Sequence, residues 1–196
     1  MNKAISRLAW LALAVAACGK GGDSGGGGGD KAPLDPAKAN AAIPAAWKGK
    51  LEFVAGEAGG KRDKVPAIMP KGWKEGFMPG SVAPPEGTQD WSHGTDYSVG
   101  STCQGVCGTV KDWPAVADDT YFKQFTSGQN SAKVVKDEKS PTGRTLVAST
   151  DDTTYVYVAW WEKEGKLLYS CTVTLKDKAK ELAGAFEAAC LTTAGK

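Results

Sequence analysis

Apolar and polar residues alternate through most of the C-terminal half of the chain, which predicts consecutive β-strands. The predicted strands cover residues 132–138, 144–150, 154–161 and 166–175. Because the connections between them are short, neighbouring strands should run antiparallel and form a four-stranded meander. The strand at 154–161 is apolar on both faces, so we expect an inner strand that is covered on both sides.

Two helices are predicted beside this meander. Residues 112–114 begin a central helix that ends by Gly128, and Asp177 is a candidate N-cap for a C-terminal helix. The C-terminal helix carries an apolar stripe at helical spacing, made of Ala179, Leu182, Phe186 and Cys190. It should cover one face of the sheet, and either the central helix or the N-terminal segments should cover the other. The predicted fold class is therefore α+β, an antiparallel sheet packed against two helices in an α/β/α sandwich-like arrangement.

The N-terminal half gives weaker patterns. Residues 51–55, 64–69 and 97–103 are plausible strands, and residues 79–94 read as a long surface loop because they are rich in proline and glycine. Residues 31–50 are rich in alanine and proline, which fits either a short helix started by Asp35 and Pro36 or an extended spacer. We expect a linker over 18–50 and one globular domain over 51–196.

The N-terminus carries the most specific signal. Lys3 and Arg7 precede an apolar run over residues 8–17, which is too short to span a membrane and fits a secretory signal peptide. This run ends in Val-Ala-Ala-Cys at residues 15–18, which resembles a bacterial lipobox. The resemblance implies cleavage after residue 17 and lipidation of Cys18, so that residues 1–17 are a lipoprotein signal peptide.

The residues after Cys18 are suited to a tether. They include five consecutive glycines over 25–29 and no large apolar side chain, so this stretch cannot bury enough surface to fold. The expected location is the bacterial cell envelope, with the acyl chains of Cys18 in the membrane. In enteric-type bacteria the inner-membrane retention signal has Asp after the lipidated cysteine, and Gly19 at that position favours the outer membrane.

Four further cysteines, an even number in an exported protein, indicate two disulfides with three possible connectivities. Cys171 lies on the strand face that also carries Val173 and Leu175, and Cys190 lies on the apolar stripe of the C-terminal helix. Both side chains should therefore point into the same core. We predict the pairs Cys171–Cys190 and Cys103–Cys107.

The Cys103 and Cys107 pair also has a chemical interpretation. Residues 100–107, with three residues between the two cysteines, loosely resemble the CxxxC segment of the copper chaperones that assemble cytochrome oxidase. That family has a proline after each cysteine and a histidine downstream, whereas this chain has Gln104, Gly108 and an upstream His93. The alternative function is thus thiol-redox or copper handling in the envelope.

The order of elements resembles a known fold family. Pro-Lys-Gly-Trp at residues 70–73 follows an early strand, and the segment KLLYSC at 166–171 follows a Glu-Gly turn before the C-terminal helix with Phe186. Together with the central helix and the meander, these features are similar to the Mog1/PsbP-like fold, which includes the DcrB and LpqN types of bacterial lipoprotein. The resemblance spans about residues 51–192 and implies a non-catalytic binding or assembly domain.

Composition narrows the function further. Lysine and arginine number 24 against 22 aspartates and glutamates, and removal of residues 1–17 makes the two equal, so nucleic-acid binding is not expected. The single histidine, His93, would have to serve any Ser-His-Asp or Cys-His mechanism, and neither a metal site nor a cofactor motif is visible. We predict no catalytic residue, no metal and no cofactor.

A binding role needs an exposed surface. Trp73 and Trp91 flank segments rich in proline and glycine, which makes them the best candidates for exposed aromatic residues that contact a partner. The expected partners are the membrane, through the anchor, and either an envelope protein or a small ligand. The predicted function is therefore a lipid-anchored, non-catalytic binding or accessory domain.

Overall fold

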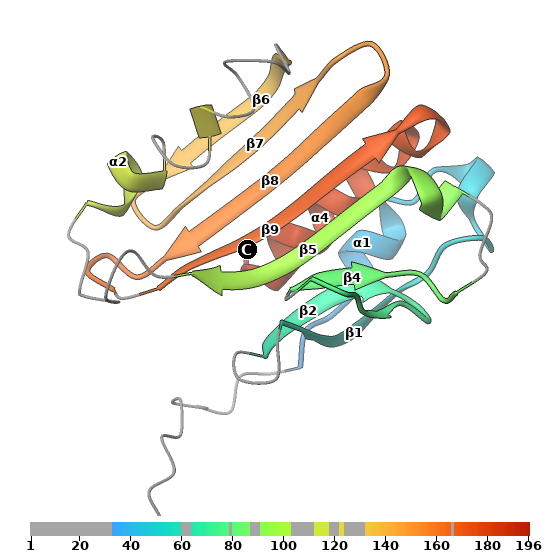
Figure 1. The fold of residues 1–196 in the computed structure, drawn as a ribbon, viewed down its shortest axis with the longest axis horizontal. Coiled ribbons are helices and arrows are strands. Elements are labelled where there is room, and N and C mark those ends of the chain that lie inside the picture. The colour runs from blue at the N-terminus through green and yellow to red at the C-terminus, as the bar shows by residue number, and fades with distance from the viewer. Residues whose placement is uncertain are drawn as a thin grey trace, which may run out of the picture. The chain divides into compact units, whose positions relative to one another are not determined.

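The computed structural model describes residues 33–59, 64–78, 80–86, 91–102, 112–117, 122–123, 132–165 and 167–196 (Figure 1). Residues Pro33–Lys196 make up one compact unit. It is a mixed α+β fold with mostly antiparallel strands and a C-terminal helix, as the sequence predicts.

The main sheet has seven strands in the order β3-β4-β5-β9-β8-β7-β6, and every neighbouring pair is antiparallel. The strands are β3 (Lys74–Glu75), β4 (Ser81–Ala83), β5 (Thr95–Thr102), β6 (Lys133–Ser140), β7 (Gly143–Ser149), β8 (Thr153–Trp161) and β9 (Leu168–Lys176). A separate antiparallel hairpin consists of β1 (Phe53–Ala58) and β2 (Val65–Pro70). The strands predicted in the C-terminal half thus form one side of a larger sheet than the sequence indicated.

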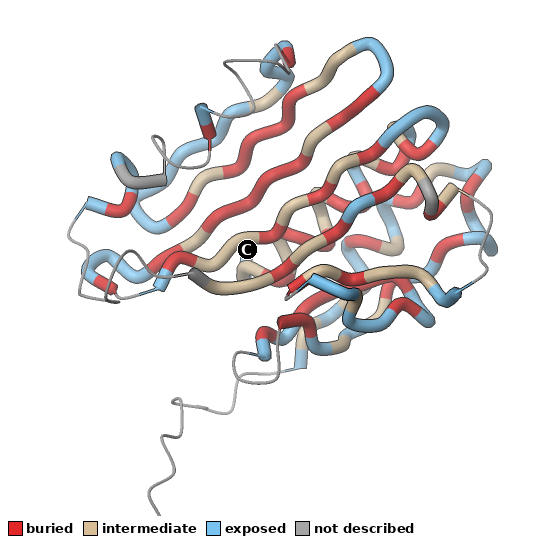
Figure 2. Tube along the Cα trace, viewed as in Figure 1, coloured by how far each residue is buried: buried red, intermediate tan, exposed pale blue. Residues whose placement is uncertain are grey.

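Both faces of the sheet are buried around β8. Val156 and Val158 belong to one hydrophobic cluster, whereas Tyr157 and Trp161 belong to a second cluster on the opposite face. In Figure 2 most of β7 and β8 is coloured as buried, while β6 is mainly exposed. The prediction that residues 154–161 form an inner strand covered on both faces is confirmed.

The second cluster is covered by the segment that follows β5. Trp113, in α2 (Trp113–Ala117), and Phe122 are both buried there against side chains of β7, β8 and β9. The Trp113 Nε1 donates to the Gly165 carbonyl at 3.2 Å, which ties α2 to the β8–β9 connection. Most of the predicted central helix lies outside the described residues. Its residues Trp113 and Phe122 are described, and both pack on this face of the sheet.

The first cluster is covered by the C-terminal helix. A 3-10 helix, η4 (Asp177–Leu182), leads into α4 (Ala183–Thr193), and Ala185, Phe186, Ala189 and Cys190 are fully buried. The prediction that Asp177 caps this helix is wrong. Lys176 occupies the N-cap position without a side-chain cap, and Asp177 itself adopts a left-handed conformation with φ of 51°.

The other side of α4 is covered by the N-terminal segments. The helix contacts α1 (Ala37–Ala41) and β2, and the Ile68 backbone N–H donates to Thr193 Oγ1 at 2.9 Å. Ile43 and Trp47, the latter in η1 (Ala45–Trp47), are buried in the same core as α4. The folded unit therefore begins at Pro33, and the predicted domain boundary at residue 51 is wrong.

The prediction of a long surface loop over residues 79–94 is also wrong. This segment contains β4 and the 3-10 helix η2 (Trp91–Gly94), and Val82 is buried against the core. Gly80, with a φ of 80°, lies in the turn just before β4.

One edge of the sheet, β6, is long and polar. Its eight residues are mostly exposed and five of them are charged, at positions 133, 136, 137, 138 and 139. A register shift between Val134 and Lys136 interrupts its pairing with β7. Charges and an irregular register are the usual features of a protected sheet edge.

Candidate functional site

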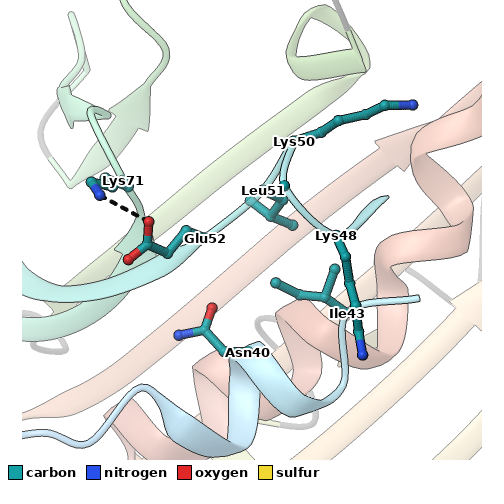
Figure 3. Close-up of a pocket in the computed structure, with 8 residues that line it drawn as sticks. Asn40, Ile43, Lys48, Lys50, Leu51, Glu52 and Lys71 are labelled. Carbon is teal, nitrogen blue, oxygen red and sulfur yellow. Dashed lines mark hydrogen bonds and ion pairs between the residues drawn. The ribbon is translucent and has the colours of Figure 1, made fainter. Parts of the chain in front are cut away.

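The described residues contain an open pocket of about 510 Å³ beside the start of β1. It lies where the end of α1, the segment after η1 and the β2–β3 turn meet, and Figure 3 shows the side chains around it. The lining residues are Asn40, Ile43, Lys48, Gly49, Lys50, Leu51, Glu52 and Lys71. A volume of this size is in the range of small-molecule sites.

The apolar floor and one wall of the pocket are fixed by the fold. Ile43 and Leu51 are buried in the main core. Asn40 donates from Nδ2 to the Phe53 carbonyl at 2.9 Å and accepts from the Phe53 N–H at 2.7 Å, which joins α1 to β1. These two bonds fix the orientation of the Asn40 amide at the wall of the pocket.

The rim of the pocket is a tight turn. The N–H groups of Lys50 and Leu51 both donate to the Trp47 carbonyl, at 3.0 and 3.2 Å. Gly49 makes this turn possible because its φ of 83° lies in the left-handed region, and no atom lies within 4 Å of where its Cβ would be. The turn therefore leaves open space on the pocket side of the backbone.

The charge of the pocket is positive. Lys71 pairs with Glu52 at 2.9 Å, so this lysine and the only carboxylate of the lining neutralise each other. No carboxylate among the described residues pairs with Lys48 or Lys50, and the Lys50 ammonium lies 5.8 Å from the centre of the Trp47 ring. In Figure 3 these two lysines leave the same rim in different directions. The arrangement can attract an anion through two flexible ammonium groups.

Trp47, which precedes the rim turn, belongs to an aromatic cluster with Trp73 and Trp91. The indoles of Trp73 and Trp91 are stacked with ring centres 5.8 Å apart, and Trp91 also meets Trp47 edge-on at 5.9 Å. The Trp47 Nε1 donates to Glu181 Oε2 at 2.8 Å, which links η1 to η4. Trp73 and Trp91, the two residues that the sequence suggested for binding, are thus brought together and pack against each other.

The expectation that Trp73 is exposed is wrong, because only 8% of its surface is accessible. Trp91 is half-buried and packs against the main core, where its ring centre lies 6.3 Å from that of Phe186. Trp91 is therefore the only one of the two that could contact a partner.

The same cluster contains a deeply buried tyrosine. Tyr97 Oη donates to the Ile68 carbonyl at 2.5 Å, and the Tyr97 ring packs on Phe186. Burial raises the pKa of Tyr97 far above its ordinary value, an effect that a hydrogen bond with Thr193 partly opposes. Tyr97 is therefore a permanently protonated structural donor.

The sequence matches no known family model and no curated protein.

The predicted disulfide between Cys171 and Cys190 is confirmed. It joins β9 to α4 with a Cα–Cα distance of 5.5 Å, and both cysteines are fully buried. The other predicted cysteine sites, Cys18, Cys103 and Cys107, lie outside the described residues. His93 is part of η2.

The described residues hold no group of three or more histidine, cysteine, aspartate or glutamate side chains arranged to bind a metal. No helix in the described ranges has the length and apolar character needed to cross a membrane.

Sequence reasoning missed the pocket because it assigned residues 31–50 to the linker. A signal was present: Ala39, Ile43 and Trp47 recur every four residues, which is helical spacing for a buried face. Pro44 interrupts that pattern, because proline cannot continue an α-helix. In the structure α1 ends before Pro44, and the separate 3-10 helix η1 begins after it.

Proposed function

We propose that this protein is an exported, lipid-anchored and non-catalytic binding or accessory domain of the bacterial cell envelope. The observation that carries the proposal is the Val-Ala-Ala-Cys sequence at residues 15–18, followed by a glycine-rich segment that reaches the folded unit at Pro33. Residues 18–32 would form a 15-residue tether, and a flexible glycine-rich chain of that length has an end-to-end distance of roughly 20 Å. The domain would stay close to the bilayer and still be able to reorient.

The buried Cys171–Cys190 disulfide supports export. Disulfides form and persist in oxidising compartments such as the bacterial periplasm and cell surface, and are rare in the cytosol. Acylation of Cys18 and formation of the Cys171–Cys190 disulfide would thus both take place on the outer side of the inner membrane.

The layer arrangement supports the finer fold assignment. The sheet has α4 on one face and the segment with Trp113 and Phe122 on the other, which is compatible with an α/β/α sandwich of the Mog1/PsbP-like type. The additional β1–β2 hairpin over α4 would be an elaboration of that arrangement.

The anchor is tested on protein produced and exported by a bacterium. We expect intact mass spectrometry to find a chain that begins at Cys18 and carries acyl groups, because the lipobox directs both reactions. The Cys18→Ala variant should lack the acyl mass, and globomycin, which inhibits lipoprotein signal peptidase, should cause the uncleaved precursor to accumulate.

Cys103→Ala is the matched control, because it removes a cysteine outside the lipobox and should leave the acyl mass in place. A product that starts at Met1 without modification would refute the anchor.

We propose the lysine-lined pocket as the binding site, with a small anion as its ligand. Lys48 and Lys50 supply two positive charges at the rim of the pocket, Ile43 and Leu51 form its apolar part, and the one carboxylate of the lining, Glu52, is neutralised by Lys71. The lining has no nucleophile–base pair, which supports binding without catalysis.

Thermal unfolding of the full chain tests the pocket. At tenfold excess over its dissociation constant, a ligand adds about 1.4 kcal/mol of stability, which corresponds to a rise in Tm of about 3–6 °C. We expect such a rise with inorganic phosphate, pyrophosphate or citrate, and none with neutral glucose.

The Lys48→Ala/Lys50→Ala double variant should lose this shift. Lys163→Ala/Lys178→Ala removes the same charge from two exposed sites far from the pocket in sequence and should keep the shift. Equal loss in both double variants would mean that anions act through net charge, which contradicts a specific site.

The alternative function, thiol-redox or copper handling, depends on Cys103 and Cys107. With Cys171 and Cys190 bonded to each other, these two are the remaining cysteines apart from Cys18. Two fast-reacting thiols at positions 103 and 107 in the native protein would favour this alternative over a second structural disulfide.

A further inference from the structure

The connection between β3 and β4 presents two large apolar side chains to solvent. Phe77 is 100% exposed and Met78 is 63% exposed, and we refer to this pair as the apex. Full exposure of a phenylalanine side chain leaves its entire apolar surface in water, which is unfavourable for the isolated protein. The apex is therefore a candidate for contact with another apolar phase.

The backbone beside the apex is firmly held. The Gly76 N–H donates to the Ser81 carbonyl at 2.8 Å, and the Ser81 N–H and hydroxyl both donate to the Met78 carbonyl, at 2.9 and 2.6 Å. These bonds hold the backbone at Gly76 and at Met78, on either side of Phe77.

The turn is also joined to the main sheet through Gly80. The Val99 N–H donates to the Gly80 carbonyl at 2.8 Å, and a Cβ on Gly80 would lie only 2.8 Å from the Val99 carbonyl oxygen. Gly80 also has a φ of 80°, which other residues rarely adopt. This close approach connects the apex to β5, near the centre of the fold.

We propose that the apex inserts into the interfacial layer of the bilayer to which the chain is anchored. The inference rests on the proposed lipid anchor at Cys18. The 15 residues from Cys18 to residue 32 span at most about 50 Å, so the folded unit always remains within reach of the membrane. The tether converts a weak contact into an intramolecular one with a high effective concentration.

The size of the apex favours a bilayer over a protein partner. A stable protein interface buries about 800 Å² on each side, whereas one exposed phenylalanine and one methionine offer a small part of that area. Two apolar side chains at a turn can instead enter the headgroup region, which accepts any apolar shape.

Methionine oxidation tests the insertion directly. The acylated protein is reconstituted in vesicles of phosphatidylethanolamine and phosphatidylglycerol and treated with hydrogen peroxide, and sulfoxide at each methionine is measured by peptide mass spectrometry. We expect Met78 to be oxidised about tenfold more slowly than in the Phe77→Asp variant, because the charged apex leaves the bilayer. Met69, which is buried in the core, is the internal reference and should react equally slowly in both proteins.

Val135→Asp is the matched control, since Val135 is 65% exposed but lies on β6, at the other edge of the sheet. It should leave the protection of Met78 unchanged. Equal oxidation of Met78 in the vesicle-bound wild type and in Phe77→Asp would overturn the inference while the anchor stands. Protection in intact envelopes but not in vesicles would also overturn it and indicate a protein partner, whereas an unacylated chain would refute both the anchor and the insertion.

Discussion

Replacing Phe186 by alanine should lower the free energy of unfolding by about 3–5 kcal/mol. The Phe186 side chain is fully buried on α4. Its ring meets Phe53 at 5.2 Å, Tyr97 at 5.6 Å and Trp91 at 6.3 Å, measured between ring centres. One side chain thus connects β1, β5 and η2 to the C-terminal helix, and its removal leaves a cavity that this rigid aromatic environment cannot close.

Urea unfolding of the full chain, followed by tryptophan fluorescence, measures this loss. Leu167→Ala is the control, because Leu167 is an apolar residue near the surface, and this variant should cost less than about 1 kcal/mol. If both variants lost the same small amount, Phe186 would not be central to the core.

Removing the Cys171–Cys190 disulfide should cost about 3 kcal/mol. The bond closes a loop with a sequence separation of 19 residues, and this restricts the unfolded chain by approximately that amount in the chain-entropy model. The loop contains the end of β9, all of η4 and α4 as far as Cys190, so the disulfide fixes the helix against the strand on which it packs.

The test compares the Cys171→Ala/Cys190→Ala double variant with the wild type under non-reducing conditions. Reduction of the Cys103→Ala/Cys107→Ala variant, in which Cys171–Cys190 is the only disulfide that the predicted pairing leaves, separates the effect of the bond from that of the lost sulfur atoms. A double variant with unchanged stability would show that packing alone holds α4 on the sheet.

The strands of the C-terminal half were predictable because their sequence alternates in a way that only a sheet satisfies. Val156 and Tyr157 face opposite clusters, as a period of two requires. Cys171 and Cys190 could be paired by the same reasoning, since each lies on the apolar side of its own element. For these long elements, local periodicity was sufficient to predict the element and the face that it buries.

The shorter elements could not be predicted because tertiary contacts decide them. β3 has two residues and β4 has three, too few to show any alternation. Trp73 and Trp91 follow turn-rich sequences, yet they are covered because each stacks on the other across 18 positions of the chain. The pocket could not be predicted for the same reason. In the sequence its lysines resemble any surface lysine, and they line one pocket only because α1 packs beside β1 in the folded chain.

The charged β6 strand has a consequence for molecules that the proposed anchor at Cys18 would hold side by side on a membrane. Proteins confined to a surface meet each other edge to edge far more often than proteins in solution, and an open strand is a template for polymerisation. In β6, Lys136 is held by Glu187 and Glu138, and Asp137 is held by Arg144. An approaching strand would meet these charges and an irregular register, so molecules held in a dense layer by the proposed anchor should remain separate and not grow into fibres.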